Sequence, residues 1–311
     1  MKIVFMGTPR AAVPTLARIL ADGHEVAAVY TQPDRPSGRG NRIGFSSVKE
    51  FAIQHGLNVL QPTKIKTAEA LEIFRGFNAD VAVVVAYGRI LPATFLSAFP
   101  MGAINVHFSL LPKYRGAAPV NWAIVNGESR TGVTTMQMDV GLDTGDILLQ
   151  RATEIGAKED AIELVDRLAD IGAHLLSETL MNYSRTAPVQ QNDADASFAP
   201  LLKKEDGLAD WGLRAVELEN RVRGFQPFPG VFTFYNGSRL SILKAKTAEE
   251  KSDGPEAGQI LTASRDVFEV ACGGGTILRI EEIQPEGKRR MSVRDFINGT
   301  KPKAGDRLSD R

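Results

Sequence analysis

Residues 81–107 read VAVVVAYGRILPATFLSAFPMGAINVH, and this stretch decides the fold. Val81–Ala86 is continuously apolar, which is typical of a central parallel strand covered by helices on both faces. Ile104–Phe108 predicts the next strand. Two buried strands in succession place the core of the first part of the chain here.

The sequence before residue 81 alternates strand and helix signals. The expected strands are Lys2–Met6, Glu25–Tyr30 and Leu57–Leu60, and the expected helices are Ala11–Ala21, Ser47–Gln54 and Thr67–Gly76. A capping box at Ser47 opens the second helix, and Thr67 caps the third. This alternation predicts an α/β fold with a doubly wound, mostly parallel sheet of the Rossmann type.

The pattern changes after Gly132. Val133–Val140 and Ile147–Ile155 predict two strands, joined by the glycine- and aspartate-rich turn GLDTGD at 141–146. Glu159–Tyr183 then predicts one long amphipathic helix.

The last third of the chain has a different texture. Residues 186–199 are polar and show neither the helical nor the strand periodicity of apolar residues, so they predict a linker. From residue 203 onward, several short strands separated by Gly, Asn, Asp and Pro predict a small OB-like β-barrel. We therefore expect an α/β domain at 1–189, a linker at 190–202 and an OB-like domain at 203–311.

Composition excludes several classes of protein. The chain has 311 residues, 43% of them hydrophobic, which is enough for a sizeable core. One cysteine rules out a disulfide framework, and four scattered histidines rule out a histidine-rich metal site, so we expect no metal. The longest apolar run, Val81–Tyr87, is far shorter than a membrane span of about 20 residues, so we expect no membrane segment and a cytoplasmic location. Lys+Arg and Asp+Glu are both 37, which excludes a uniformly basic surface but not local basic patches.

The densest polar group lies at the end of the 104–108 strand. Asn105 and His107 point to the same face there, at the sheet edge where open α/β folds place ligands. An aspartate from the 141–146 turn would make a base–orienter pair with His107 if the two met, which the spacing leaves open. For the pair alone, a satisfied core histidine beside a turn-forming asparagine is the commoner interpretation.

Longer motifs carry a resemblance to a known family. They are Asn105-Val106-His107, Ser109-Leu110-Leu111-Pro112, Gly132-Val133-Thr134 and MQMDVGLDTGD at 136–146. Together they resemble the 10-formyltetrahydrofolate-dependent formyltransferases. GTP at 7–9, TQPDRPSGRG at 31–40, VVAYG at 84–88 and RGAAP at 115–119 resemble the members that act on methionyl-tRNA. The resemblance covers nearly the whole chain, with 1–189 as the catalytic domain and the carboxyl-terminal domain as an OB-type barrel.

The resemblance implies both the reaction and its catalytic residues. The amino group of methionine on initiator tRNA would attack the formyl carbon of the co-substrate 10-formyltetrahydrofolate, giving formylmethionyl-tRNA for translation initiation. Asn105 and protonated His107 would stabilise the oxygen of the tetrahedral intermediate. Asp143 would hold His107 in its charged form and help relay a proton. Asp139 and Asp146 are the alternative carboxylates, ranked lower because the family motif aligns at Asp143.

The resemblance also implies where the folate lies. Ser109, Leu110, Leu111 and Pro112 would form a loop along it, with backbone groups contacting the pterin. Phe108 is larger than the small residue most common at this position in the transfer-RNA enzymes. We expect its ring to narrow the folate or formyl pocket without loss of activity.

Two basic segments are candidates for contacting tRNA phosphates. They hold Arg35, Arg39 and Arg42 in the 32–42 loop, and Lys288, Arg289 and Arg290 near the carboxyl end. The plain alternatives are a solvated loop and a solubilising tail. Two other functions remain: a formyltransferase for a small amine (glycinamide ribonucleotide or an amino-sugar nucleotide), and a non-catalytic folate- or RNA-binding module. The second domain and the arginine loop argue against the first, and the intact Asn–His–Asp triplet argues against the second.

Overall fold

The computed structural model describes residues 1–37, 42–248 and 254–310, and the chain forms two compact units. Unit 1 comprises Met1–Pro119, Arg130–Glu154 and Val165–Ala199, and unit 2 comprises Val120–Ser129, Ile155–Leu164 and Pro200–Arg311. The units therefore alternate along the chain, whereas the sequence predicts one boundary near residues 190–202. Trp122 and Val125 give part of the reason, because they pack against the apolar core of unit 2.

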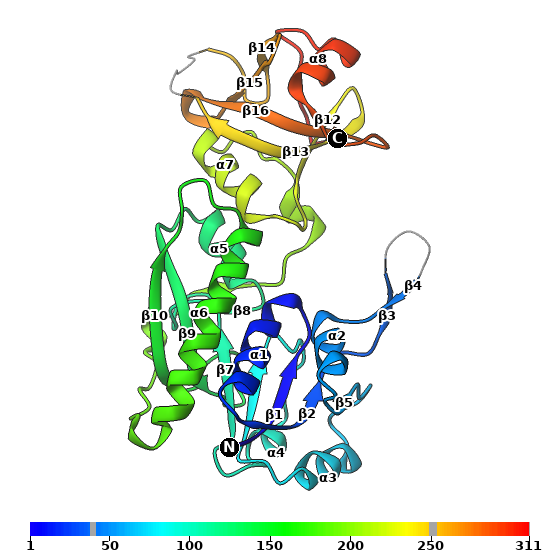
Figure 1. Cartoon of the computed structure of the whole chain (residues 1–311). Coiled ribbons are helices and arrows are strands. Elements are labelled where there is room, and N and C mark those ends of the chain that lie inside the picture. Colours follow the sequence, from blue (N-terminus) through cyan, green and yellow to red (C-terminus); the bar gives the residue numbers. More distant parts are fainter. Residues whose placement is uncertain (38–41, 249–253, 311) are drawn as a thin grey trace. The chain divides into compact units, whose positions relative to one another are not determined.

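Unit 1 is built on a seven-stranded sheet in the order β10-β9-β7-β6-β1-β2-β5 (Figure 1). The strands are β1 (Lys2–Gly7), β2 (Glu25–Tyr30), β5 (Val59–Leu60), β6 (Val81–Val85), β7 (Ala103–His107), β9 (Arg130–Gln137) and β10 (Ile147–Glu154). Neighbours are parallel except for β9, which is antiparallel to both β7 and β10. The predicted doubly wound, mostly parallel sheet is confirmed. All five residues of β6 are buried, as expected for a central strand.

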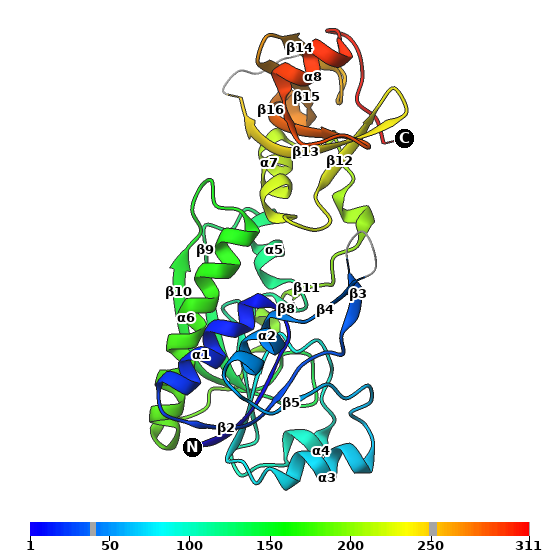
Figure 2. The ribbon, with the colours of Figure 1, turned by 45° about the vertical axis from the view of Figure 1, so that its right-hand side comes forward.

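Helices cover both faces of this sheet. They are α1 (Val13–Ala21), α2 (Ser47–Gln54), α3 (Ala68–Gly76), α4 (Ala93–Leu96) and α6 (Ala161–Asn182). Phe74 of α3 and Phe95 of α4 join Val84 in one buried cluster on one face. On the other face Gly172 lets α6 approach closely, because a Cβ there would lie 2.8 Å from Val106 Cγ1. Figure 2, like Figure 1, shows α1 beside α6 and α3 beside α4.

Helix starts follow local hydrogen bonding. Thr67 caps α3 as predicted, accepting a hydrogen bond from the Ala70 amide at 3.2 Å. The cap of α2 is Ser46, which accepts from the Lys49 amide at 3.1 Å, one residue before the capping box predicted at Ser47.

The arginine-bearing loop expected at 32–42 contains a short antiparallel hairpin. Its strands are β3 (Arg35–Ser37) and β4 (Arg42–Gly44). Lys49 forms an ion pair with Asp34 at the base of the hairpin, and Gln61 donates to Asp34 Oδ1 at 2.8 Å. Arg39 lies outside the described residues.

The predicted linker is hydrogen-bonded to the rest of unit 1. Val189 and Ile147 exchange two backbone hydrogen bonds of 2.8 and 2.9 Å. Further along, β11 (Phe198–Ala199) pairs in parallel with β8 (Arg115–Gly116). Residues 189–199 therefore pack as part of unit 1.

Short 3₁₀ turns lie at Arg10–Ala12, Tyr183–Arg185, Asp193–Asp195, Lys204–Gly207 and Gly273–Gly275.

Unit 2 holds an antiparallel sheet in the order β12-β13-β16-β15-β14, with β17 paired to β16. Its strands are β12 (Val231–Tyr235), β13 (Ser238–Thr247), β14 (Ile260–Ser264), β15 (Val267–Cys272), β16 (Thr276–Pro285) and β17 (Met291–Ser292), and its helices are α7 (Ala215–Gly224), α8 (Val293–Thr300) and most of α5 (Pro119–Val125). The terminal segment links both edge strands: the Ile260 amide donates to the Asp306 carbonyl, and Phe234 and Ser309 exchange two bonds. This closure agrees with the OB-like barrel that the sequence predicts.

Candidate active site

The carboxyl end of β7 carries the polar pair that the sequence singles out. Asn105 and His107 lie two residues apart and are 8% and 6% exposed. The His107 Nε2 donates a hydrogen bond to the Tyr114 carbonyl at 3.0 Å. Within the described ranges, the Asn105 amide has no hydrogen-bond partner. The side-chain NH₂ group of Asn105 therefore makes no hydrogen bond within the described part of the protein.

Asp143 meets His107 from the turn between β9 and β10. Its Oδ2 lies 3.7 Å from His107 Nδ1 and accepts a hydrogen bond from the Gly116 amide at 2.9 Å. Asp143 has a left-handed backbone with φ of +54°. Gly145 must be glycine, because a Cβ there would lie 1.7 Å from the Gln137 carbonyl oxygen. The structure thus brings together two side chains whose proximity the spacing left open.

The two nitrogens of the imidazole face different acceptors. Nε2 faces a carbonyl and Nδ1 faces a carboxylate, and only the imidazolium donates from both nitrogens. The 3.7 Å separation from Asp143 is an ion-pair distance longer than a hydrogen bond. Nδ1 therefore makes no hydrogen bond to another described residue.

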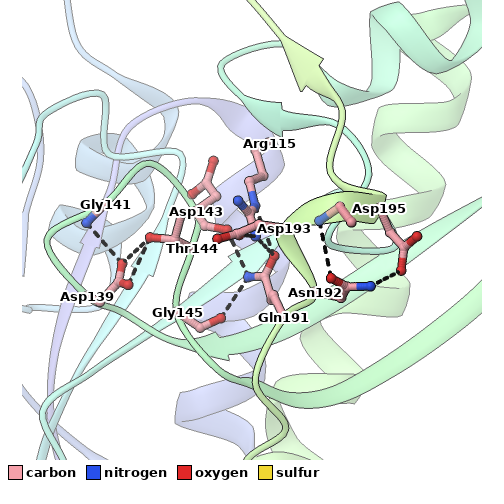
Figure 3. Close-up of polar contacts among 11 residues, drawn as sticks. Arg115, Asp139, Gly141, Asp143, Thr144, Gly145, Gln191, Asn192, Asp193 and Asp195 are labelled. Atoms are coloured by element: carbon pink, nitrogen blue, oxygen red, sulfur yellow. Dashed lines mark hydrogen bonds and ion pairs between the residues drawn. The ribbon is translucent and has the colours of Figure 1, made fainter.

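The two alternative carboxylates lie in other surroundings. Asp139 accepts hydrogen bonds from the Thr144 hydroxyl at 2.8 Å and from the Gly141 amide at 3.0 Å, so it braces the turn (Figure 3). Asp146 is exposed, and its side chain makes no hydrogen bond or ion pair with another described residue. Of the three aspartates, Asp143 is the one paired with His107.

The predicted folate loop, Ser109-Leu110-Leu111-Pro112, is tied to the rest of unit 1. Ser109 and Leu111 are buried, and Leu110 and Pro112 are half-buried. All four carbonyls accept hydrogen bonds: Thr134 Oγ1 donates to that of Ser109, the Lys113 amide to that of Leu110, Gln150 Nε2 to that of Leu111 and the Ser197 amide to that of Pro112. Each carbonyl therefore keeps only its second lone pair for a ligand.

Phe108 does not point into the pocket that the sequence assigned to it. A Cβ on Gly172 of α6 would lie 3.4 Å from the Phe108 ring and 2.8 Å from Val106. Successive strand residues alternate between faces, so Phe108 and Val106 face α6 while Asn105 and His107 face the other way. The expectation that this ring narrows the formyl pocket is wrong, and the alternation along the strand could have indicated it.

The basic residues proposed for tRNA lie in two places. Arg35 and Arg42 begin β3 and β4 in unit 1. Lys288, Arg289 and Arg290 are exposed between β16 and β17 in unit 2. Arg290 forms an ion pair with Glu282, whereas the Lys288 and Arg289 side chains have no partner in the described part of the chain.

Gln191 lies in the predicted linker, and no sequence pattern indicates its contacts. It is 7% exposed, and its Nε2 donates to the carbonyls of Asp143 and Gly145 at 2.9 and 2.7 Å (Figure 3). Its Oε1 accepts from Nε and Nη2 of the buried Arg115 at 3.0 and 2.8 Å. A polar run without periodicity cannot reveal such a contact.

Two other chemistries find little support among the described residues. Cys272 is buried in β15, and burial raises the pKa of its thiol to about 12, so it is a poor nucleophile at neutral pH. Within residues 1–37, 42–248 and 254–310, no three His, Cys, Asp or Glu side chains are grouped to hold a metal ion.

None of the helices described here has both the length and the apolar character needed to cross a bilayer.

Comparison with known proteins identifies the family. The formyl transferase family matches residues 1–180, and the formyl transferase C-terminal domain matches residues 201–301. The chain belongs to the formyl transferase family. This formyltransferase is 50% identical to a protein of Citrifermentans bemidjiense named methionyl-tRNA formyltransferase, over 100% of the chain and 97% of that protein. It is also 50% identical to the protein of that name from Caldanaerobacter subterraneus subsp. tengcongensis, over 96% of the chain and 97% of the relative.

Solved structures share the fold of the formyltransferase. WlaRD, a sugar 3N-formyl transferase, matches with a TM-score of 0.67 and 20% identity, over 93% of this chain and 99% of that one. Methionyl-tRNA formyltransferase from Clostridium thermocellum matches with a TM-score of 0.58 and 18% identity, over 81% and 95% of the two chains. The fold, the family and the enzyme class inferred from the sequence are confirmed.

Proposed function

We propose that this formyltransferase transfers the formyl group of 10-formyltetrahydrofolate to the methionyl amino group of initiator methionyl-tRNA. The observation that carries this proposal is the 50% identity, over the full length of the chain, to proteins named methionyl-tRNA formyltransferase. A function in translation initiation makes the cytoplasm the expected location.

The site chemistry of this proposal assigns one role to each polar group. The methionyl nitrogen attacks the formyl carbon, and the carbonyl electron pair moves onto the formyl oxygen. Asn105 and the His107 Nδ1–H donate to that oxygen while it is negatively charged. The C–N10 bond then breaks, the attacking nitrogen loses a proton, and N10 of tetrahydrofolate gains one. Asp143 stabilises the charged imidazole and accepts or passes the proton through water.

Substrate binding is assigned to the surfaces that the sequence indicated. Ser109, Leu110, Leu111 and Pro112 would lie along the folate, since they follow β7 directly. For the tRNA, Lys288 and Arg289 are the strongest candidates, because they are exposed cations without an acidic partner among the described residues. Arg35, Arg39, Arg42 and Arg290 complete the proposed set.

A formylation assay with several acceptors tests the function. The enzyme, 10-formyltetrahydrofolate and charged initiator tRNA should yield formylmethionyl-tRNA, whereas glycinamide ribonucleotide and an amino-sugar nucleotide should yield no product. Uncharged tRNA controls for formylation elsewhere on the RNA. Product from a small amine with none from methionyl-tRNA would refute the proposed acceptor, and no product from any amine would refute formyl transfer itself.

A further inference from the structure

The Gln191 side chain sits at the centre of a buried hydrogen-bond network beside the candidate active site. A primary amide offers two N–H donors and two acceptor lone pairs. Gln191 uses all four: two on the carbonyls of Asp143 and Gly145, and two on the Arg115 guanidinium. Carbonyls only accept and a guanidinium only donates, so the chemistry of its partners fixes the orientation of this amide.

The two carbonyls held by Gln191 flank the turn residue Thr144. Asp143, immediately before it, has a φ of +54°, in the left-handed region that non-glycine residues rarely adopt. The hydrogen bonds at 2.9 and 2.7 Å hold the turn on both sides of Thr144 (Figure 3). They stabilise the backbone from which the Asp143 carboxylate projects.

The Arg115 side of the network reaches the same carboxylate by a second path. The residue after Arg115, Gly116, donates its amide to Asp143 Oδ2 at 2.9 Å. The residue before it, Tyr114, accepts from His107 at 3.0 Å. Residues 114–116 therefore contact both members of the His107–Asp143 pair. Gln191 connects this segment to the turn through its hydrogen bonds with Arg115 and with the carbonyls of Asp143 and Gly145.

We propose that Gln191, held by Arg115, is a positioning residue that sets the Asp143 carboxylate against His107. It hydrogen-bonds to neither His107 nor the Asp143 carboxylate and acts through the backbone of the turn and through Arg115. The effect on turnover rests on the proposed function, whereas the geometric claim does not.

The discriminating variant is Gln191→Glu. One carboxylate oxygen still accepts from Arg115, while the other replaces the amide nitrogen and faces the carbonyls of Asp143 and Gly145 without a proton to donate. The size of the side chain and the Arg115 contact are kept, and the hold on the turn is lost. Gln191→Met, which removes every hydrogen bond at similar size, is the second variant should Gln191→Glu fail to fold.

Asn192→Ala is the matched control. The Asn192 amide is exposed and caps the 193–195 turn, accepting from the Ala194 amide at 3.2 Å and donating to Asp195 at 2.8 Å (Figure 3). The Asn192→Ala substitution removes a side chain adjacent to Gln191 that makes no hydrogen bond to the Asp143 turn.

Steady-state kinetics give the first readout. For Gln191→Glu we expect kcat to fall about ten- to a hundredfold, with each KM changed less than about threefold, because misplaced groups slow the chemistry rather than the binding. In an Asp143→Asn background the same change should cost nothing further, since the carboxylate it positions is already gone. Losses that multiply in the double variant, or equal losses in Asn192→Ala, would overturn the proposal.

Amide hydrogen exchange gives a readout that needs no activity. The Gly116 amide should exchange about tenfold faster in Gln191→Glu than in the unchanged chain, because its acceptor carboxylate is no longer held in place. Other amides of unit 1 and the Asn192→Ala protein should be unchanged. An unaltered Gly116 rate would overturn the proposal even if the chain proves to act on another amine.

Discussion

Replacing Asp143 with Asn tests the proposed catalytic arrangement most directly. The change keeps the size of the side chain and removes one negative charge, 3.7 Å from His107 Nδ1. At an effective dielectric constant of about 20, two unit charges at this distance attract by about 4 kcal/mol. The Asp143 side chain is 16% exposed, so water screens part of this attraction, and we take about half as the loss.

A loss of about 2 kcal/mol in stabilising the imidazolium corresponds to a fall in kcat of about thirtyfold. The assay is formylation of charged initiator tRNA with both substrates varied, so that kcat and each KM are obtained separately. Both KM values should change little, because Asp143 is assigned to the reaction rather than to binding. Circular dichroism and thermal unfolding should show a folded protein.

Asp146→Asn and Asp139→Asn are the matched controls. Asp146 is exposed and makes no hydrogen bond or ion pair with another described residue, so its variant should keep activity within about twofold. Asp139 braces the turn through Thr144 and Gly141, so an intermediate loss is expected. Full activity in Asp143→Asn, with a large loss in Asp146→Asn, would refute the assignment of the carboxylate.

Three further outcomes are expected. Asn105→Ala should lower kcat about a hundredfold or more without unfolding, since it removes one donor to the developing oxyanion, and near-normal turnover would contradict that role. Replacing both Lys288 and Arg289 by Ala should weaken tRNA binding and reduce the slope of log affinity against log salt concentration by about 2. Arg290→Ala should change this slope less, because the Arg290 cation is already paired with Glu282. Equal slopes in the unchanged chain and in both variants would contradict the phosphate contacts. Burial raises the pKa of the Cys272 thiol to about 12, and only the thiolate reacts with iodoacetamide. At pH 8 the reaction should therefore be far slower in the folded protein than in the denatured protein. Equal rates in the two states would contradict the burial of Cys272.

A deletion after residue 199 is a poor way to separate the two ligands' binding sites. Trp122 and Val125 pack against the core of unit 2, so removing 200–311 would expose them to water. Loss of activity in such a fragment would mix a missing tRNA surface with new apolar exposure. Point substitutions in the intact chain avoid this ambiguity.

Local sequence patterns predicted most elements of the fold. The apolar run at 81–86 indicated a buried central strand, and Thr67 marked the start of α3, because both signals are set by neighbours along the chain. Helix α8 was missed although Ser292 and Asp295 form its capping signal, since the basic residues before it drew the interpretation toward a binding surface. The alternation of β7 put Asn105 and His107 on one face correctly.

The sequence by itself determined the main strands and helices of the first 180 residues, the family and the polar pair at the end of β7. The family resemblance ranked Asp143 first, but only the tertiary structure shows that its carboxylate lies beside His107 and that Gln191 holds its turn. The reason is physical: periodicity reports which residues share a face within one element, over a few residues. Contacts between distant turns depend instead on how β8, β9, β10 and the 189–199 segment pack, and no local pattern encodes that arrangement.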